Sequence, residues 1–185
     1  MIYEVENKFA IADPHAQRAR FAVVGAKWSA AEVLVDRYFA HPCRDFRQTD
    51  EALRIRAVGE EIFVTYKGPK LDKSTKTRRE LELPVGHGQP GIDAFHELLE
   101  SLGFQPVVEV RKHREHAQLA WEGQTVTACW DEVDELGTYV ELEIAADEAQ
   151  LSAAQAAILS CAQALGLGEP IRRSYLGMLL ALRAM

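Results

Sequence analysis

The sequence lacks the features that mark membrane, secreted and zinc-binding proteins. No apolar run approaches the roughly 20 residues that a membrane helix needs, and the first residues lack the basic-then-apolar pattern of a secretory signal. Cys43, Cys129 and Cys161 are odd in number and have no CxxC spacing, which argues against a disulfide framework and against a cysteine zinc site. We therefore expect a soluble cytoplasmic protein with reduced thiols.

The sequence also lacks an excess of positive charge. Its formal net charge is -7 over 185 residues, so a broad basic face for nucleic acid is not expected. A small anionic ligand is compatible with this balance, because a local pocket can oppose the overall sign. With 48% hydrophobic residues, the chain has enough apolar material for one globular domain over residues 1–185.

Alternation of apolar and polar residues, which is typical of half-buried strands, occurs more often along the chain than helical spacing does. It predicts eight antiparallel strands with a few helices, and hence an α+β fold. The strands are expected near residues 2–10, 33–40, 52–58, 61–67, 77–85, 108–116, 124–131 and 138–145.

Capping residues and helical spacing predict four helices around these strands. They are expected at about residues 14–25, 92–103 and 147–165, and from Ser174 onward. We expect the last helix to pack on the outside of the sheet through its leucines. The lysine-rich stretch 68–76 contains residues that break secondary structure, and it is expected to form a mobile flap at the mouth of a site.

Charged residues recur on one face of the predicted strands. In the first strand, Glu4, Glu6 and Lys8 share one side, because successive side chains point to opposite faces. The same alternation groups Arg54 with Arg56, Thr65 with Lys67, Arg78 with Glu80 and Glu82, Lys112 with Arg114, Cys129 with Asp131, and Glu141 with Glu143. A shift of one residue in the fifth strand would exchange Arg78 for Arg79 as the inward group.

These charged faces have two interpretations. Antiparallel sheets often carry one solvated face, and for any single strand this is the simpler interpretation. Taken together, however, the helices need the apolar face of the sheet, and an edge-free barrel would then enclose the charged face. A charged interior is costly unless a ligand compensates both signs, and a metal-bound polyphosphate would do so.

The motifs of the chain resemble those of a known family. In order, the sequence contains Glu4-Val5-Glu6-Asn7-Lys8, Asp36-Arg37-Tyr38-Phe39, Leu53-Arg54-Ile55-Arg56, Thr65-Tyr66-Lys67-Gly68-Pro69, Arg79-Glu80-Leu81-Glu82, Lys112-His113-Arg114, Asp131-Glu132-Val133 and Glu141-Leu142-Glu143. By these motifs the whole chain resembles the CYTH superfamily, also called triphosphate tunnel metalloenzymes. The spacing is most similar to the class IV adenylate cyclase-like branch. The resemblance implies an eight-stranded antiparallel β-barrel, the triphosphate tunnel, with peripheral helices.

The resemblance also implies roles for individual residues. Mg²⁺ or Mn²⁺ would be held by Glu4, Glu6, Glu141 and Glu143. The phosphates would be bound by Lys8, Arg54, Arg56, Lys67, Arg78, Lys112 and Arg114. The residues that take part in catalysis would be Glu4, Glu6, Lys8, Lys67 and Asp131.

The activity implied by the resemblance is conversion of ATP to cyclic AMP and pyrophosphate. Two alternatives stay open: a triphosphatase that hydrolyses thiamine triphosphate or inorganic triphosphate, and a sensor that binds a polyphosphate or nucleotide without turnover. The ligand in each case is a small triphosphate, and neither nucleic acid nor a membrane is expected as a partner. A homodimer is an expectation of the family alone.

Overall fold

The computed structural model describes residues 2–71 and 75–184, and this part of the chain contains eight β-strands. The strands are β1 (Ile2–Ala10), β2 (Glu32–Ala40), β3 (Ala52–Val58), β4 (Glu61–Lys67), β5 (Glu80–His87), β6 (Gln105–Trp121), β7 (Gln124–Val133) and β8 (Gly137–Asp147). The described helices are α1 (Pro14–Val23), α2 (Phe46–Thr49), α3 (Gly88–Ser101), α4 (Leu151–Ala164) and α5 (Tyr175–Arg183). The predicted α+β class and the eight strands are confirmed.

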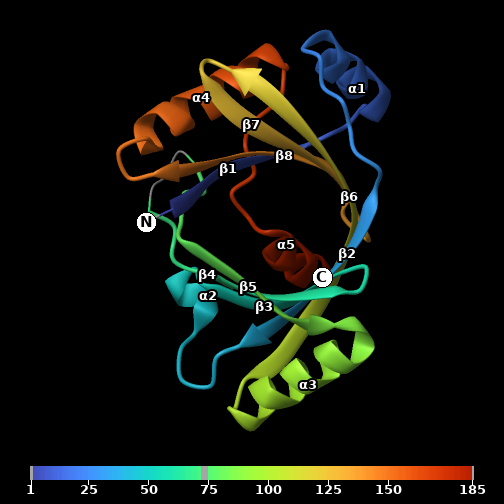
Figure 1. Cartoon of the computed structure of the whole chain (residues 1–185), viewed down its shortest axis with the longest axis vertical. Helices are drawn as coiled ribbons and strands as arrows, with labels where there is room; N and C mark the ends of the chain where they lie inside the picture. The colour runs from blue at the N-terminus through green and yellow to red at the C-terminus, as the bar shows by residue number, and fades with distance from the viewer. Residues whose placement is uncertain (1, 72–74, 185) are drawn as a thin grey trace.

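The strands form one antiparallel sheet in the order β1-β8-β7-β6-β2-β3-β4-β5, and this sheet curls so that its two edges approach each other (Figure 1). A short segment, residues 75–79, joins the edges, and we call it the seam. Glu4 and Arg78 exchange two backbone hydrogen bonds of 3.1 and 3.2 Å, and Lys76 N donates to Glu6 O at 2.9 Å. The curled sheet thus surrounds a central space.

Two helices cover the convex face of this sheet. α4 packs over β8, β1 and β7, where Ile158 lies in one apolar cluster with Val5 and Leu142. α3 packs over β5, β3 and β4, where Leu99 lies in another cluster with Ile55. These clusters use the apolar positions of the alternating strands, so the charged positions face inward. No helix in residues 2–71 or 75–184 is long and apolar enough to cross a membrane.

The C-terminal helix α5 lies inside one mouth of the barrel (Figure 1), and the prediction that it packs on the outside of the sheet is wrong. Its Tyr175 and Leu179 pack against side chains that point into the barrel at this end: Tyr38, Val110, Val133 and Tyr139. The leucine spacing showed that the helix needs an apolar surface. It could not show that the inner ends of the strands would provide one.

The boundaries of some elements differ from the prediction. β6 is far longer than the predicted strand at 108–116, because its first part pairs with β2 and its second part pairs with β7. β5 begins at Glu80 and not at residue 77, because the preceding residues form the seam. α3 begins at Gly88, although the prediction started it at Ile92. Its first turn contains no apolar residues at helical spacing, so the sequence did not reveal it.

Candidate active site: a charged tunnel

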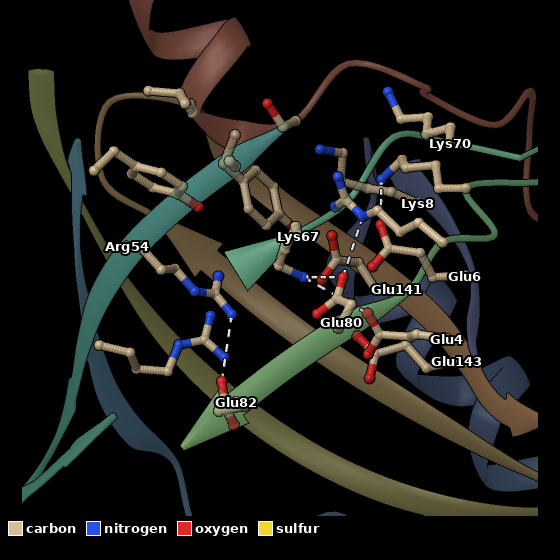
Figure 2. A pocket seen from close by; sticks show the side chains of 18 of the residues that line it. Glu4, Glu6, Lys8, Arg54, Lys67, Lys70, Glu80, Glu82, Glu141 and Glu143 are labelled. Carbon is tan, nitrogen blue, oxygen red and sulfur yellow. Dashed lines mark hydrogen bonds and ion pairs between the residues drawn. The ribbon is translucent and has the colours of Figure 1, made fainter. Parts of the chain in front are cut away.

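A cavity of about 390 Å³ lies inside the barrel, and charged side chains line it (Figure 2). It is lined by every residue that the sequence analysis gives as a metal or phosphate ligand: Glu4, Glu6, Lys8, Arg54, Arg56, Lys67, Arg78, Lys112, Arg114, Glu141 and Glu143. Asp131, the remaining predicted catalytic residue, is fully buried and pairs with the lining residues Lys112 and Arg114. The alternation of the strands therefore brings these side chains together.

The carboxylates gather where β1, β8 and β5 meet. Two groups, Glu4 with Glu6 and Glu80, and Glu6 with Glu141 and Glu143, each have one oxygen per residue within 4.8 Å of the others. Glu6 belongs to both groups, because it faces Glu143 across the β1–β8 ladder. Glu80 was predicted to face inward, but it was not predicted to be a metal ligand.

The state of Glu4 shows that this region fits a cation. Its buried Oε2 accepts no hydrogen bond from the described residues, and Lys67 Nζ lies 3.6 Å away, within ion-pair range only. Burial raises the pKa of Glu4 well above its ordinary value despite Lys67, and neighbouring carboxylates, Glu143 foremost, raise it further. A divalent cation would relieve both effects, and a ligand set made only of carboxylate oxygens suits Mg²⁺ or Mn²⁺.

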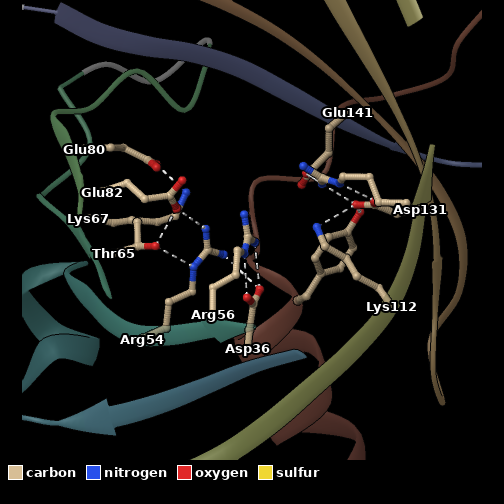
Figure 3. Close-up of polar contacts among 12 residues, drawn as sticks. Asp36, Arg54, Arg56, Thr65, Lys67, Glu80, Glu82, Lys112, Asp131 and Glu141 are labelled. Carbon is tan, nitrogen blue, oxygen red and sulfur yellow. Dashed lines mark hydrogen bonds and ion pairs between the residues drawn. The ribbon is translucent and has the colours of Figure 1, made fainter. Parts of the chain in front are cut away.

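One side of the tunnel, which we call the β2–β3 wall, consists of Asp36, Arg54 and Arg56 (Figure 3). Arg56 donates from Nε and Nη2 to the two Asp36 oxygens at 2.7 and 2.9 Å, and Arg54 Nη1 donates to Asp36 Oδ2 at 2.9 Å. Burial alone would raise the pKa of Asp36, but the two guanidinium groups outweigh it and hold that pKa well below its usual range. Asp36 thus fixes the direction of both arginines.

The adjoining part of the tunnel, which we call the β6–β7 wall, consists of Lys112, Arg114 and Asp131. Figure 3 labels Lys112 and Asp131. Asp131 accepts from Arg114 Nε at 2.6 Å and from Lys112 Nζ at 3.1 Å. It also accepts a hydrogen bond of 2.8 Å from the hydroxyl of Tyr175 in α5. Arg114 reaches further, because it also pairs with Glu141 and lies 3.5 Å from Glu143 Oε1.

The seam contributes two more cations. Arg78 lines the cavity and donates from Nε to Glu80 at 3.1 Å, whereas its neighbour Arg79 is exposed. The register left open between them is therefore the one with Arg78 inward. Lys76 is also buried, and its Nζ lies 2.7 Å from Glu6 Oε1. Its assignment to a flap was wrong, while residues 72–74 of that predicted flap lie outside the described residues.

Lys8 sits between the tunnel and α5. Its Nζ donates to the carbonyl oxygen of Arg173 at 2.6 Å and lies 3.9 Å from the centre of the Tyr175 ring. Burial, aided by the positive charge of Lys76, lowers the pKa of Lys8 to about 7. An amine with this pKa can gain or lose a proton near neutral pH.

A second cavity of about 890 Å³ adjoins the tunnel at the α5 end. Both cavities are lined by Tyr38, Ala52 and Ser174, so they meet there. The second cavity is less charged, and Phe46 and His41 are among its lining residues. Its shape comes from the segment between β2 and β3 and from α5, which the sequence analysis did not place near the site.

Several lining residues were missed by the sequence analysis. Tyr38 and Tyr175 line the tunnel, but nothing in their spacing distinguishes them from core aromatics. His116 also lines it, and its Nδ1 lies 3.4 Å from the buried Cys129 Sγ. The alternation of β6 could have placed His116 inward, since it follows Lys112 and Arg114 at the same period of two.

Comparison with known proteins supports the sequence resemblance. The family model of the CYTH domain matches residues 3–175. A protein of Methanocaldococcus jannaschii, named "Putative adenylate cyclase MJ0240", is 39% identical over 140 residues, which are 76% of this chain and 75% of that protein.

Solved structures show the same architecture. The PH1819 protein of Pyrococcus horikoshii superposes with a TM-score of 0.82 at 36% identity, over 99% of this chain and 100% of that one. A Hippeastrum protein, HpAC1, described as a putative adenylyl cyclase with a dominant triphosphatase activity, has a TM-score of 0.64 at 16% identity. The match covers 98% of this chain and 96% of that one. At that identity the likeness concerns the fold alone.

Proposed function

Because the chain belongs to the CYTH domain family, we propose that it is a metal-dependent enzyme that converts ATP to cyclic AMP and pyrophosphate in the tunnel. The observation that carries the proposal is that both signs of charge line one cavity. Its carboxylates form two groups that share Glu6, and its basic residues include those of the two walls. This arrangement complements a triphosphate that carries Mg²⁺ or Mn²⁺.

The chain's own residues would bind and orient the triphosphate. Asp36 and Thr65 together use only some of the N–H groups of Arg54 and Arg56, so others could donate to phosphate oxygens. Lys112 and Arg114 would hold the phosphates from the other wall. The metal, held by Glu4, Glu6, Glu80, Glu141 and Glu143, would neutralise charge that develops on the phosphate oxygens.

In the cyclisation, the ribose 3′-oxygen bonds to the α-phosphorus, and the bond from that phosphorus to the α–β bridging oxygen breaks. Pyrophosphate leaves with the electron pair, and the 3′-hydroxyl loses its proton. Lys8 Nζ could accept this proton, since its pKa is lowered to about 7. Positioning and charge stabilisation supply most of the catalysis in such reactions.

The second cavity supports an organic triphosphate as substrate. It adjoins the tunnel and offers the aromatic side chains of Phe46 and His41, against which a planar base could pack. A volume of about 890 Å³ is ample for a nucleoside, given that ligand pockets span about 300–1,000 Å³. Inorganic triphosphate would leave this cavity unused.

A second candidate is hydrolysis of a triphosphate, in which water attacks the terminal phosphorus. It is favoured by the position of the charges, because the tunnel alone could hold three linked phosphates whatever they are attached to. The Hippeastrum protein, described by its triphosphatase activity, has the same fold. A sensor that binds a triphosphate without turnover is a third hypothesis compatible with the same site.

Product analysis separates these functions. Purified protein would be incubated with Mg²⁺ or Mn²⁺ and with ATP, thiamine triphosphate or inorganic triphosphate, and the products resolved by chromatography. Cyclic AMP with an equal amount of pyrophosphate supports the proposal. Orthophosphate from any of the three establishes hydrolysis instead, and binding without product establishes the sensor.

Variants of the carboxylates test whether the tunnel is the site. Glu6→Gln or Glu143→Gln should lose metal-dependent turnover more than fold stability, because each removes a ligand charge from the tunnel. Glu132→Gln is the matched control, since Glu132 neighbours Asp131 on the outward face of β7 and is exposed. Unchanged turnover in Glu6→Gln would refute the site assignment.

A further inference from the structure

The carboxylate shared by the two acidic groups already has a cation beside it. Lys76 Nζ lies 2.7 Å from Glu6 Oε1, and both side chains are almost fully buried. Burial alone would raise the pKa of Glu6, but the positive charges of Lys76, Lys67 and Arg78 together outweigh it, with Lys76 the largest of the three, and the pKa of Glu6 is lowered. A metal ion that uses this Glu6 oxygen would meet the Lys76 ammonium within a few ångströms.

The backbone that carries Lys76 is fixed. Lys76 N donates to Glu6 O at 2.9 Å, and the seam is held from outside by Arg172 Nη1, which donates to Thr75 O at 3.1 Å. Gln155 of α4 donates to Thr77 Oγ1 at 3.2 Å. What can move is the lysine side chain, whose four-carbon stem ends in a compact charge.

The position of Lys76 offers a second partner for that charge. It lines the same cavity as Lys8 and Arg78 and is close enough to influence the pKa of both Lys8 and Glu141. A triphosphate in the tunnel would bring acceptor oxygens into this cavity, and a lysine released from Glu6 could donate to them.

We propose that Lys76 is an internal counter-ion that competes with the divalent metal for Glu6 and becomes a phosphate ligand when the metal binds. This rests on the proposed function, because it assumes a metal–triphosphate complex in the tunnel. Lys76 keeps the buried carboxylate neutralised when no metal is bound, which avoids an unpaired buried charge. The metal-free tunnel is thereby stabilised at the expense of metal affinity. Metal and triphosphate then bind cooperatively, since each favours the same position of Lys76.

The test is a charge-removing variant that keeps the length of the stem, Lys76→Met. Titration calorimetry with Mn²⁺ alone should show binding at least about tenfold tighter than in the wild type, because a repulsive charge a few ångströms away is gone. With Mn²⁺ saturating, inorganic triphosphate should bind about tenfold more weakly, because a donor is lost. Lys70→Met is the matched control: Lys70 lines the same cavity but pairs with Asp50, so Mn²⁺ affinity should not change.

Thermal unfolding provides a second readout if the variant is less stable. Lys76→Met without metal should melt below the wild type, because Glu6 has lost its buried partner, and Mn²⁺ should raise its melting temperature more than that of the wild type. If the wild type binds Mn²⁺ and triphosphate but Lys76→Met binds Mn²⁺ no more tightly than the wild type does, the proposed role of Lys76 is overturned. The proposed function is then unaffected. A wild type that binds no Mn²⁺ even with triphosphate present overturns both.

Discussion

The two walls of the tunnel share one design but differ in their connections. In each wall a buried aspartate lies between two cations: Asp36 between Arg54 and Arg56, and Asp131 between Lys112 and Arg114. The β2–β3 wall has no described ion pair to Glu4, Glu6, Glu141 or Glu143. In the β6–β7 wall, Arg114 pairs with Glu141 and Asp131 holds Tyr175 of α5.

This difference indicates that the two walls have different roles in ligand binding and stability. Under the proposed function the β2–β3 wall would bind phosphate and not the metal, so changes there should affect triphosphate binding, and stability through its own buried pair, but not metal binding. The β6–β7 wall would bind phosphate too, and it also contacts the carboxylates and α5, so changes there should affect metal binding and stability as well. Five substitutions test this, in order of decreasing effect.

Asp131→Asn should have the largest effect. It leaves two buried cations short of their counter-charge, and breaking such a pair costs about 3–5 kcal/mol of unfolding free energy. Arg114 would then pair more closely with Glu141, and Mn²⁺ affinity should fall. Urea denaturation and Mn²⁺ titration measure the two effects, and a stable variant with normal Mn²⁺ affinity would show that the walls are equivalent.

Asp36→Asn should cost less, about 3 kcal/mol, because Arg54 keeps its bond to Thr65 and Arg56 is partly solvated. Mn²⁺ affinity should not change. The pKa of Asp36 is depressed in the folded state, so its contribution is present above the unfolded pKa of about 3.9 and is lost as the pH falls below it. The stability difference between wild type and variant should therefore shrink below about pH 4. A constant difference down to pH 2 would contradict this.

Arg56→Ala should weaken triphosphate binding by about 10- to 100-fold, or about 1.4–2.8 kcal/mol, and leave Mn²⁺ binding unchanged. Arg114→Ala should weaken triphosphate binding too, but it should tighten Mn²⁺ binding, because Glu141 and Glu143 lose a competing cation. Calorimetry with each ligand checks both. Arg37→Ala is the control, because Arg37 pairs with Glu109 on the outer face of the sheet. Equal Mn²⁺ affinities in Arg56→Ala and Arg114→Ala would remove the distinction.

Tyr175→Phe should have the smallest effect, about 1 kcal/mol of unfolding free energy, because Asp131 keeps its two cations when the hydroxyl is removed. In an Asp131→Asn background the same change should cost less, since the charged acceptor is gone. A double-mutant cycle by urea denaturation measures the coupling. Strictly additive costs would mean that the hydroxyl does not connect α5 to this wall.

The inner face of the barrel was predictable because it follows from an alternation of two along each strand. Glu4, Glu6 and Lys8 needed no knowledge of their neighbours to be placed on one side, and the same holds for Arg54 and Arg56. Whether Arg78 or Arg79 faces inward could not be read, because these residues precede the regular strand and their direction is set by backbone bonds to β1.

What could not be predicted depends on contacts between distant parts of the chain. Lys76 looked like a loop lysine because its partner, Glu6, is 70 positions away. The capping of α5 by Ser174 was visible in the sequence, and the structure shows the hydroxyl accepting from Gly177 N. The place of α5 inside the barrel was not visible, since an apolar helix face does not say which surface it meets.

Among the described residues, the seam is the place where the strands of the barrel are joined by the fewest backbone hydrogen bonds. Elsewhere in the described chain, neighbouring strands are joined by antiparallel ladders, whereas β1 meets the seam through only three backbone hydrogen bonds. Glu4 and Glu6 lie on one side of the seam and Glu80 on the other. A cation bound by these carboxylates would link the two edges of the sheet. Metal binding should therefore stabilise the closed form of the barrel. The backbone amides of Glu4, Lys76 and Arg78 would then exchange their hydrogens with solvent more slowly when the metal is bound.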